Sequence, residues 1–369
     1  MPELWLNYGG TDIILDLKVE NLSLVENSKF DIRTDESLAE EIKSIPVTDE
    51  TILVPLDGSN STIQTTASLV SQAETAGISL SIESIPGARK QLSNKISTQN
   101  ITIIEKNNDH FIKRANEKST IFISKSNIDP FFGYYGTPTN LLRLFEQNKM
   151  NEVFHSRVDD LPHPGEKFPP IEIANKFCEN MEAMSIEIIS NNSGIHNIYY
   201  GKIIQSFQNA TDKLNNLSME NEQGLKSVIL GTNIDSSSSR TLTSSLDLLW
   251  NSINVLKKNA TVVIISENSK GFGSKALEKL AYGKLKLEDY GNYDYFDGLE
   301  HLMFINSLSE KYNVAILSSL PKYYLKEIFG FNIFSNVQEA AEKILDINGK
   351  SHRISLIQDP NIAIFKKNN

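Results

Sequence analysis

The sequence predicts an α/β protein of two domains, each with a mostly parallel sheet flanked by helices, and with a ligand-binding cleft between the domains. The chain has 369 residues, more than one hydrophobic core usually serves. Short apolar runs alternate with helically spaced stretches in both halves, as in parallel strands joined by helices. A polar stretch near residue 220 is suited to a domain boundary. We therefore expect domains at 1–220 and 225–350, with strands in 351–369 that pack back on the first domain.

The sequence pattern of the first half predicts a hairpin followed by strand–loop–helix units. Two alternating runs, 4–8 and 11–17, flank Gly9-Gly10, which is a hairpin signal. The apolar run 51–55 ends in the polar loop 56–61, after which helical spacing begins. The other expected strands are 79–85, 101–105, 119–124 and 186–189, and the expected helices are 35–44, 62–76, 141–151, 171–184 and 199–216.

The second half repeats this alternation. Apolar strands are expected at 227–230 and 260–265, and each is followed by a loop rich in glycine, hydroxyl and amide side chains. The further expected helices are 242–256, 275–282, 299–312, 321–329 and 336–347, and the further expected strands are 314–318, 352–358 and 362–366. Such a succession favours a doubly wound sheet.

The composition narrows the class of protein. A net charge of −10 argues against an extended nucleic-acid surface. No apolar run approaches the roughly 20 residues that a membrane span requires. The N-terminus lacks the pattern of a secretion signal, and Cys178 is the only cysteine, so no intrachain disulfide can form. We expect a cytoplasmic protein that binds neither nucleic acid nor membrane, and its oligomeric state stays open.

Glycine-containing loops at strand ends are the candidate ligand site. Ligands of parallel sheets bind at the carboxyl ends of strands, and loops with glycine and hydroxyl groups suit backbone capture of anions. In the loop 129–139 we expect ligand contacts from Gly133, Gly136, Thr137 and Thr139. In other loops we expect them from Asp57, Ser59, Asn60 and Arg240. The alternative is that these residues only form turns, as such loops commonly do.

His155, sixteen residues after Thr139, is the candidate metal ligand. A neutral imidazole can bind a metal beside a phosphate. The alternative is a scaffold histidine. Motifs of P-loop proteins, zinc proteases and serine hydrolases are absent from the sequence.

Several segments, taken in order, resemble the nickel-dependent lactate racemase family. The opening Asn7-Tyr8-Gly9 is similar to the family's N-terminus, and 53–61 falls on its strand ending in D-H-T-R-P. Residues 131–139 fall on its F-x-G-F-S-G-G-R-K segment, His155-Ser156 on its N-H-S, and 229–233 on the strand that opens its second domain. The resemblance implies two α/β domains and a nickel pincer nucleotide between them.

The resemblance also implies that the cofactor anchor is lost. In the family a lysine tethers the cofactor, and that position is Thr139, which cannot form the link. His155 keeps the position of the nickel-ligating histidine. No covalent tether is therefore expected, and the cofactor itself stays unknown.

The family's acid–base groups are also replaced. The histidine of its first loop falls on Gly58, while Asp57 keeps the acidic position. The histidine before the F-x-G segment falls on Asp129, the one weak candidate for a catalytic base. The family's glutamine and lysine of the second domain fall on Arg240 and Asp247.

Two functions follow as hypotheses. The first is a divergent lactate racemase-like protein that binds a small anionic or nucleotide-type ligand in the inter-domain cleft, with an isomerase reaction on a 2-hydroxy acid if it is an enzyme. The second is a non-catalytic sensor or interaction protein that has kept the scaffold and lost the chemistry.

Overall fold

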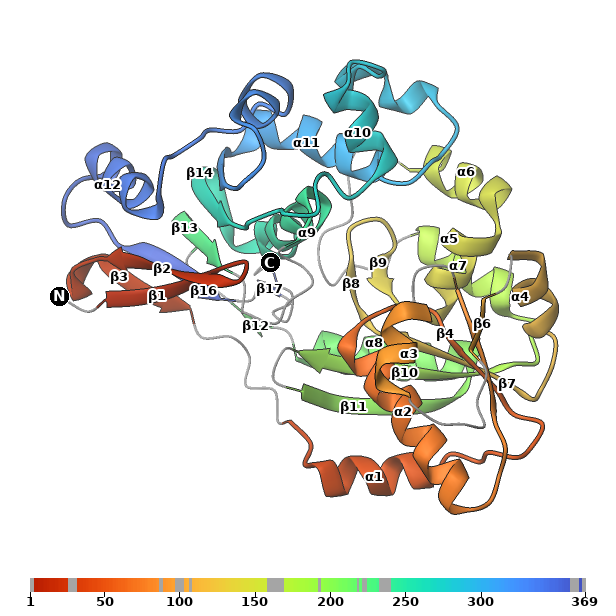
Figure 1. Ribbon diagram of the computed structural model, residues 1–369. Helices are drawn as coiled ribbons and strands as arrows, with labels where there is room; N and C mark the ends of the chain where they lie inside the picture. Colours follow the sequence, from red (N-terminus) through yellow and green to blue (C-terminus); the bar gives the residue numbers. More distant parts are fainter. Residues whose placement is uncertain are drawn as a thin grey trace.

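The computed structural model has two lobes, each formed by a sheet with helices packed against it (Figure 1). The described residues are 3–25, 32–85, 89–96, 103–105, 108–157, 169–191, 194–217, 219–220, 224–231, 240–358 and 365–366. The predicted α/β class with two mostly parallel sheets is confirmed. Among the helices in these ranges, none is both long and apolar enough to cross a membrane.

The first lobe contains a six-stranded sheet of order β11-β10-β7-β4-β5-β6. Its strands are β4 (Ile52–Pro55), β5 (Ser81–Ser84), β6 (Ile103–Glu105), β7 (Thr120–Lys125), β10 (Met184–Asn191) and β11 (Gly194–Lys202). All neighbours are parallel except β10 and β11. Its helices are α1 (Asp35–Lys43), α2 (Asn60–Thr75), α3 (Arg89–Lys95), α4 (Asn108–Arg114), α5 (Thr137–Phe145), α6 (Gln147–His155), α7 (Pro169–Cys178) and α8 (Ile203–Asn216). A short hairpin, β8 (Asn127–Asp129) and β9 (Gly133–Tyr135), precedes α5.

The second lobe contains a fully parallel sheet of order β15-β14-β13-β16-β3. Its strands are β3 (Leu22–Val25), β13 (Leu225–Gly231), β14 (Leu256–Ile265), β15 (Asn313–Leu317) and β16 (Ile354–Gln358). Its α-helices are α9 (Leu242–Ser252), α10 (Lys275–Ala281), α11 (Leu299–Lys311) and α12 (Val337–Asn348). Shorter helices are η1 (Val19–Asn21), η3 (Ile253–Val255), η4 (Leu287–Asn292) and the π-helix η5 (Tyr324–Ile328). A small pair joins β12 (Met219–Glu220) to β17 (Phe365–Lys366).

The N-terminal strands belong to the second lobe. The hairpin of β1 (Glu3–Tyr8) and β2 (Thr11–Asp16) buries Leu6 and Leu15 against the second sheet. Strand β3 then pairs with β16, which also pairs with β13. Strand pairing thus groups residues 22–25 and 354–358 with the second sheet, and the shared apolar cluster places the hairpin against it, whereas the expected ranges placed these residues with the first domain. Apolar contacts across 300 residues of chain, rather than any local pattern, decide this arrangement.

Two predicted helices have different bounds for identifiable reasons. The expected helix 199–216 begins at Ile203, because residues 194–202 form β11, with Glu187 of β10 opposite Tyr199. The expected helix 141–151 is interrupted at Glu146, whose non-helical backbone (φ −129°, ψ 71°) separates α5 from α6. Cys178 is buried in the core of the first lobe.

Tyr295 of the second lobe connects the two lobes. Its ring stacks on Phe131, with centroids 5.5 Å apart, and lies 5.7 Å from Phe154. Its N–H donates to Asn151 Oδ1 at 2.7 Å, and its carbonyl accepts from the Gln147 amide. One apolar cluster consequently includes side chains of both lobes.

Replacing Tyr295 with alanine is expected to destabilise the protein by about 3 kcal/mol, because a buried aromatic side chain is removed at the junction of the lobes. Tyr295→Phe keeps the ring and loses only the hydrogen bond to Glu300, so a loss of about 1 kcal/mol is expected. Urea denaturation of both variants measures these differences. Equal stability of Tyr295→Ala and wild type would contradict the role given to this contact.

Candidate functional site

The main chain before α5 lies against the first sheet. Gly133 has a φ of +89°, in the left-handed region that glycine favours. Gly136 is the N-cap of α5, and a Cβ there would lie 2.6 Å from the ring of Phe207 and 2.8 Å from Glu187 Oε2. Glycine at 136 is therefore needed for the close approach of α5 to β10 and α8. As a result, the loop 129–139, which was predicted to bind an anion, lies against the side chain of Glu187.

The carboxylate of Glu187 occupies the N-terminus of α5. Its Oε1 accepts from the Thr137 N–H at 3.0 Å, and its Oε2 accepts from the Ser126 hydroxyl at 2.7 Å. Helix N-termini bind anions because their first N–H groups have no partner within the helix. Here the anion comes from β10. Burial raises the pKa of Glu187 to about 7, although the hydrogen bonds from Ser126 and Thr137 favour the charged form.

Thr139, at the family's tether position, is fully buried and caps α5. Its Oγ accepts from the Gly136 N–H at 3.0 Å and donates to the Gly136 carbonyl at 3.1 Å. The hydroxyl is thereby used within the helix cap. The next residue, Asn140, donates to Ser124 Oγ at 2.8 Å and ties the same turn to the end of β7.

Asp129, the weak candidate for a catalytic base, is held by four donors. Arg143 contacts both carboxylate oxygens, at 2.6 and 3.0 Å, and the N–H groups of Phe131 and Phe132 donate to Oδ1. The Asp129 side chain is 3% exposed and that of Arg143 is 22% exposed. Arg143 also lies 3.7 Å from Glu300 of the second lobe. A catalytic role for Asp129 stays a prediction, while the geometry accounts for it as an ion pair.

The predicted loop 56–61 is also partly used within the first lobe. Asp57 accepts from the N–H of Ser59 at 2.9 Å and from the N–H of Lys125 at 2.8 Å. Ser59 is the N-cap of α2, and its Oγ accepts from the Thr62 N–H. Asn60 is exposed at the first position of α2, whose first turn contains no acidic residue. This helix start faces solvent.

His155 is the last residue of α6 and is exposed. Its ring meets that of Phe154 edge-on, with centroids 5.5 Å apart. Among the described residues no group of three histidine, cysteine or acidic side chains could hold a metal ion. Its metal-ligand role stays a prediction.

In the second lobe, Arg240 is exposed at the start of α9, and the preceding residues 232–239 lie outside the described ranges. Asp247 of α9 lies 3.0 Å from His301 Nε2. Burial opposes the charge of His301, but Asp247 and Glu300 outweigh it and raise the pKa of this imidazole to about 9. His301 is thus a cation within the second lobe at neutral pH.

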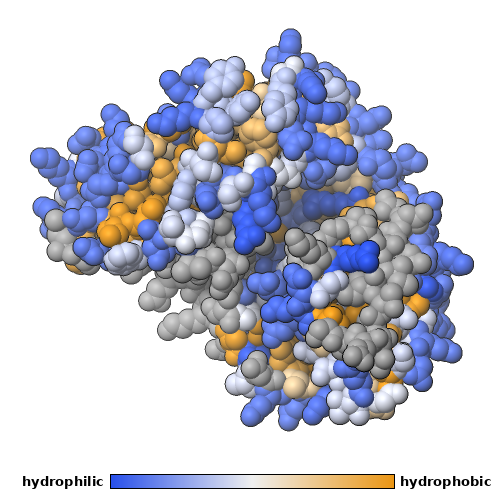
Figure 2. Space-filling view, in the orientation of Figure 1, coloured by the Kyte–Doolittle hydropathy of each residue, from blue (hydrophilic) through white to orange (hydrophobic). Residues whose placement is uncertain are grey.

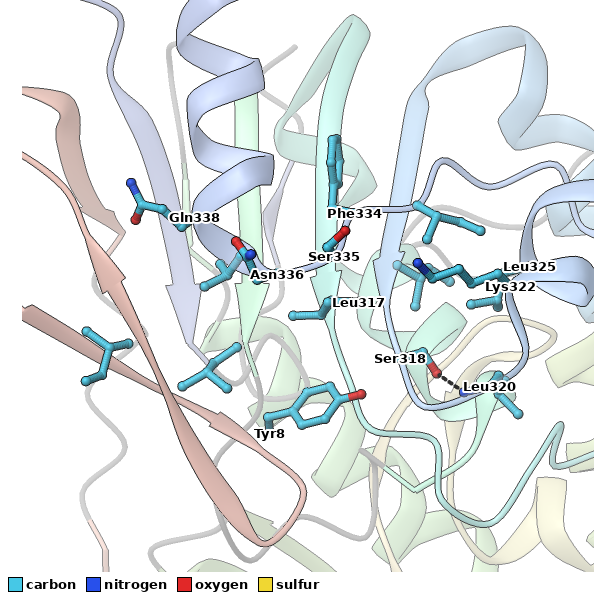
Figure 3. A pocket seen from close by; sticks show the side chains of 15 residues that line it. Tyr8, Leu317, Ser318, Leu320, Lys322, Leu325, Phe334, Ser335, Asn336 and Gln338 are labelled. Atoms are coloured by element: carbon cyan, nitrogen blue, oxygen red, sulfur yellow. Dashed lines mark hydrogen bonds between the residues drawn. The ribbon is translucent and has the colours of Figure 1, made fainter.

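A cavity of about 380 Å³ lies in the second lobe, at the carboxyl end of β15. Figure 3 shows Tyr8 reaching in from the hairpin, with Asn336 and Ser335 on another side and Lys322 beside Leu325. Apolar side chains gather on this face over the β1–β2 hairpin, below α12 (Figure 2). The sequence reasoning missed this cavity, because it depends on the hairpin docking to the second lobe.

The two lobes define a class of fold that is known from solved structures. The structure is similar to that of the lactate racemase apoprotein from Thermoanaerobacterium thermosaccharolyticum, with a TM-score of 0.74 over 99% of this chain and 100% of that chain, at 14% identity. A protein from Thermotoga maritima matches with a TM-score of 0.62 over 91% of this chain and 98% of that chain, at 10% identity. No protein-family model and no curated protein sequence matches the chain. The chain therefore has a lactate racemase-like fold, as the resemblance predicted.

The residues at the expected attachment point do not fit a tethered nickel nucleotide. A Cβ at Gly136 would already meet Phe207 and Glu187, so this turn has no room beside it. The helix N-terminus is occupied by a carboxylate, and the Thr139 hydroxyl is part of the cap. A cofactor here would have to displace the buried Glu187 side chain from its hydrogen bonds to Thr137 and Ser126.

The elevated pKa of Glu187 predicts a pH-dependent stability. The folded state keeps the Glu187 proton up to about pH 7, whereas the ordinary pKa is 4.5. The free energy of unfolding therefore falls as pH rises from 4.5 to about 7, by about 3 kcal/mol at most. In Glu187→Gln this contribution is absent, so the difference between wild type and variant should shrink with pH. Urea denaturation at several pH values tests this, and parallel curves for the two proteins would contradict it.

Replacing Asp129 with asparagine should cost about 3 kcal/mol of stability, because Arg143 loses its carboxylate in a largely buried position. Asp346→Asn, on the exposed part of α12, is the matched control and should change stability by less than about 0.5 kcal/mol. Equilibrium unfolding measures both. If Asp129→Asn is as stable as wild type, the ion pair does not hold this turn.

Proposed function

We propose that the chain is a binding protein on a lactate racemase-like scaffold, which takes a small anionic or nucleotide-type ligand between the lobes and does not invert 2-hydroxy acids through a nickel nucleotide. The observation that carries this proposal is the Glu187 carboxylate at the N-terminus of α5. A tethered cofactor would have to displace this buried group and open the cap formed by Thr139. This favours the second of the two hypotheses drawn from the sequence.

The proposed anion site is the start of α2. Asn60 is exposed there, and no acidic side chain in the first turn competes with a ligand. The N–H groups of a first helical turn attract anions through their own dipoles and the helix dipole. Arg240 is the exposed cation that the second lobe contributes in this proposal. A carboxylate or phosphate group is the part of the ligand that these residues would hold.

An isomerase on this scaffold is the alternative, and the acid–base groups argue against it. Inversion of a carbon centre needs groups that can move protons on both faces of the substrate. Gly58 has no titratable group, and the Asp129 carboxylate is paired with Arg143. We therefore assign no proton transfer to these residues.

The catalytic part of the proposal is tested on protein produced with nickel in the medium. The intact mass should equal the 41.4 kDa of the sequence, the purified protein should hold no stoichiometric nickel, and neither enantiomer of lactate should be inverted. A covalent adduct together with inversion of lactate would overturn the non-catalytic assignment.

The binding part is tested by thermal shift with nucleotides and 2-hydroxy acids. A ligand of the folded state raises the melting temperature. Asn60→Asp places a carboxylate in the first turn of α2 and should weaken binding at least about tenfold, through repulsion of an anion. Asn306→Asp, on an exposed position of α11, should leave binding unchanged. Binding that is insensitive to Asn60→Asp would show that the ligand lies elsewhere.

A further inference from the structure

A second cavity, of about 520 Å³, lies in the second lobe, at the amino-terminal ends of the parallel strands. It is formed by the amino-terminal ends of β13, β14 and β15, by the segment 332–334, and by the C-terminal half of α12. A cavity of this size suits a small organic ligand. It is separate from the site proposed between the lobes, which uses α2 of the first lobe.

A large bulge in β14 forms one wall. Leu256 pairs with Leu225, but the next pair is Thr261 with Ser227, so β14 uses five residues where β13 uses two. Within the bulge, Asn259 has a φ of +61°, a backbone conformation that is uncommon outside glycine. Bulges of this kind redirect side chains at sheet edges. This one turns Lys257 and Lys258 toward the cavity, which both of them line.

The charge around the cavity is strongly positive. Lys226 from β13 and Lys343 from α12 join Lys257 and Lys258 in its lining, and all four are exposed. Among the described residues no ion pair is recorded for any of the four, although the whole chain has a net charge of −10. His352, beside Lys226, has its pKa lowered by burial and by that lysine. A cluster of one sign raises the local concentration of the opposite charge.

The floor and rim of the cavity are apolar. Ala260, Ala315 and Ile344 are buried in the floor, and Ile333 and Phe334 form a side wall. The Phe334 ring points away from Tyr8 of the other cavity (Figure 3). Ile347 at the rim is 65% exposed, an unusual exposure for a large aliphatic side chain. Covering it with an apolar group would be favourable, at about 25 cal/mol for each Å² removed from water.

We propose that this cavity binds a small organic anion with an apolar body, whose carboxylate or phosphate group contacts the lysines of the β14 bulge and whose hydrocarbon part covers Ile344 and Ile347. The lysines select the charged group and the floor selects the apolar part. A fully polar anion leaves Ile347 in water, and a neutral alcohol leaves the lysines without a partner, so both bind more weakly.

Isothermal titration calorimetry with octyl phosphate below its micellar concentration tests the proposal, with inorganic phosphate and octan-1-ol as comparison ligands. Octyl phosphate should bind at least about tenfold more tightly than either. Its affinity should fall when salt is raised from 0.05 to 0.5 M, because salt screens exposed charges over roughly 4–14 Å at these concentrations. Equal binding of octanol, or no effect of salt, would overturn the assignment of an anion.

Variants locate the site. Lys257→Gln together with Lys258→Gln should weaken octyl phosphate binding at least about tenfold, as expected for lost charge contacts. Lys284→Gln with Lys286→Gln, two exposed lysines elsewhere in the second lobe, is the matched control and should have no effect. Ile347→Ser should weaken octyl phosphate and leave inorganic phosphate unchanged. Asn60→Asp should leave octyl phosphate binding unchanged, which separates this proposal from that of the inter-lobe site. Equal weakening by both lysine pairs would overturn it.

A membrane lipid could offer the same chemistry, and vesicle sedimentation distinguishes it. Vesicles of phosphatidylcholine with one third phosphatidylglycerol should not retain the protein, since a concave cavity of this size encloses a single small molecule. Retention on vesicles without binding of monomeric octyl phosphate would overturn the proposal in favour of a lipid surface.

Discussion

The position of α5 depends on one buried carboxylate. Glu187 extends from the middle of β10 and accepts hydrogen bonds from Ser126 and from the first N–H of α5. Gly136 makes this possible, because any larger residue would meet Phe207 and the carboxylate itself. With α5 held in this way, Arg143 on the same helix reaches Asp129 on one side and Glu300 of the second lobe on the other. The contact of Arg143 with the second lobe therefore depends on Glu187, a side chain of the first sheet.

The sequence predicted the elements whose signals are local. The apolar run ending at Pro55, followed by a polar loop and helical spacing, correctly indicated β4 and α2. The segment 199–202 was misassigned as helix, because its two tyrosines and glycine are compatible with either pattern until β10 pairs with it. The place of β1, β2 and β3 in the second lobe could not be read from the sequence, since β3 pairs with a strand about 330 residues away and the hairpin packs on side chains from the second half of the chain.

The sequence singled out the loop around Thr139, but it did not predict the contacts that this loop makes. Replacement of the tether lysine by Thr139 was visible in the resemblance to lactate racemases. The position of Glu187 at the N-terminus of α5 was not predicted, although a glutamate inside the apolar strand 184–191 was a signal, since a buried acidic residue must find hydrogen-bond donors. The lysine-lined cavity was equally hidden, because the bulge of β14 is defined only by its register against β13.

The strand order has a consequence for biosynthesis. Strand β16 lies between β13 and β3. The first strand of this sheet in the chain, β3, therefore pairs only with the last one, β16. A growing polypeptide has made all strands of the six-stranded sheet by residue 202, long before residue 354 leaves the ribosome. The N-terminal hairpin must remain without its partner sheet during that time, with Leu6 and Leu15 uncovered. The second lobe can thus be completed only after the strands of the first lobe have been made, and its N-terminal strands wait for the C-terminal part of the chain.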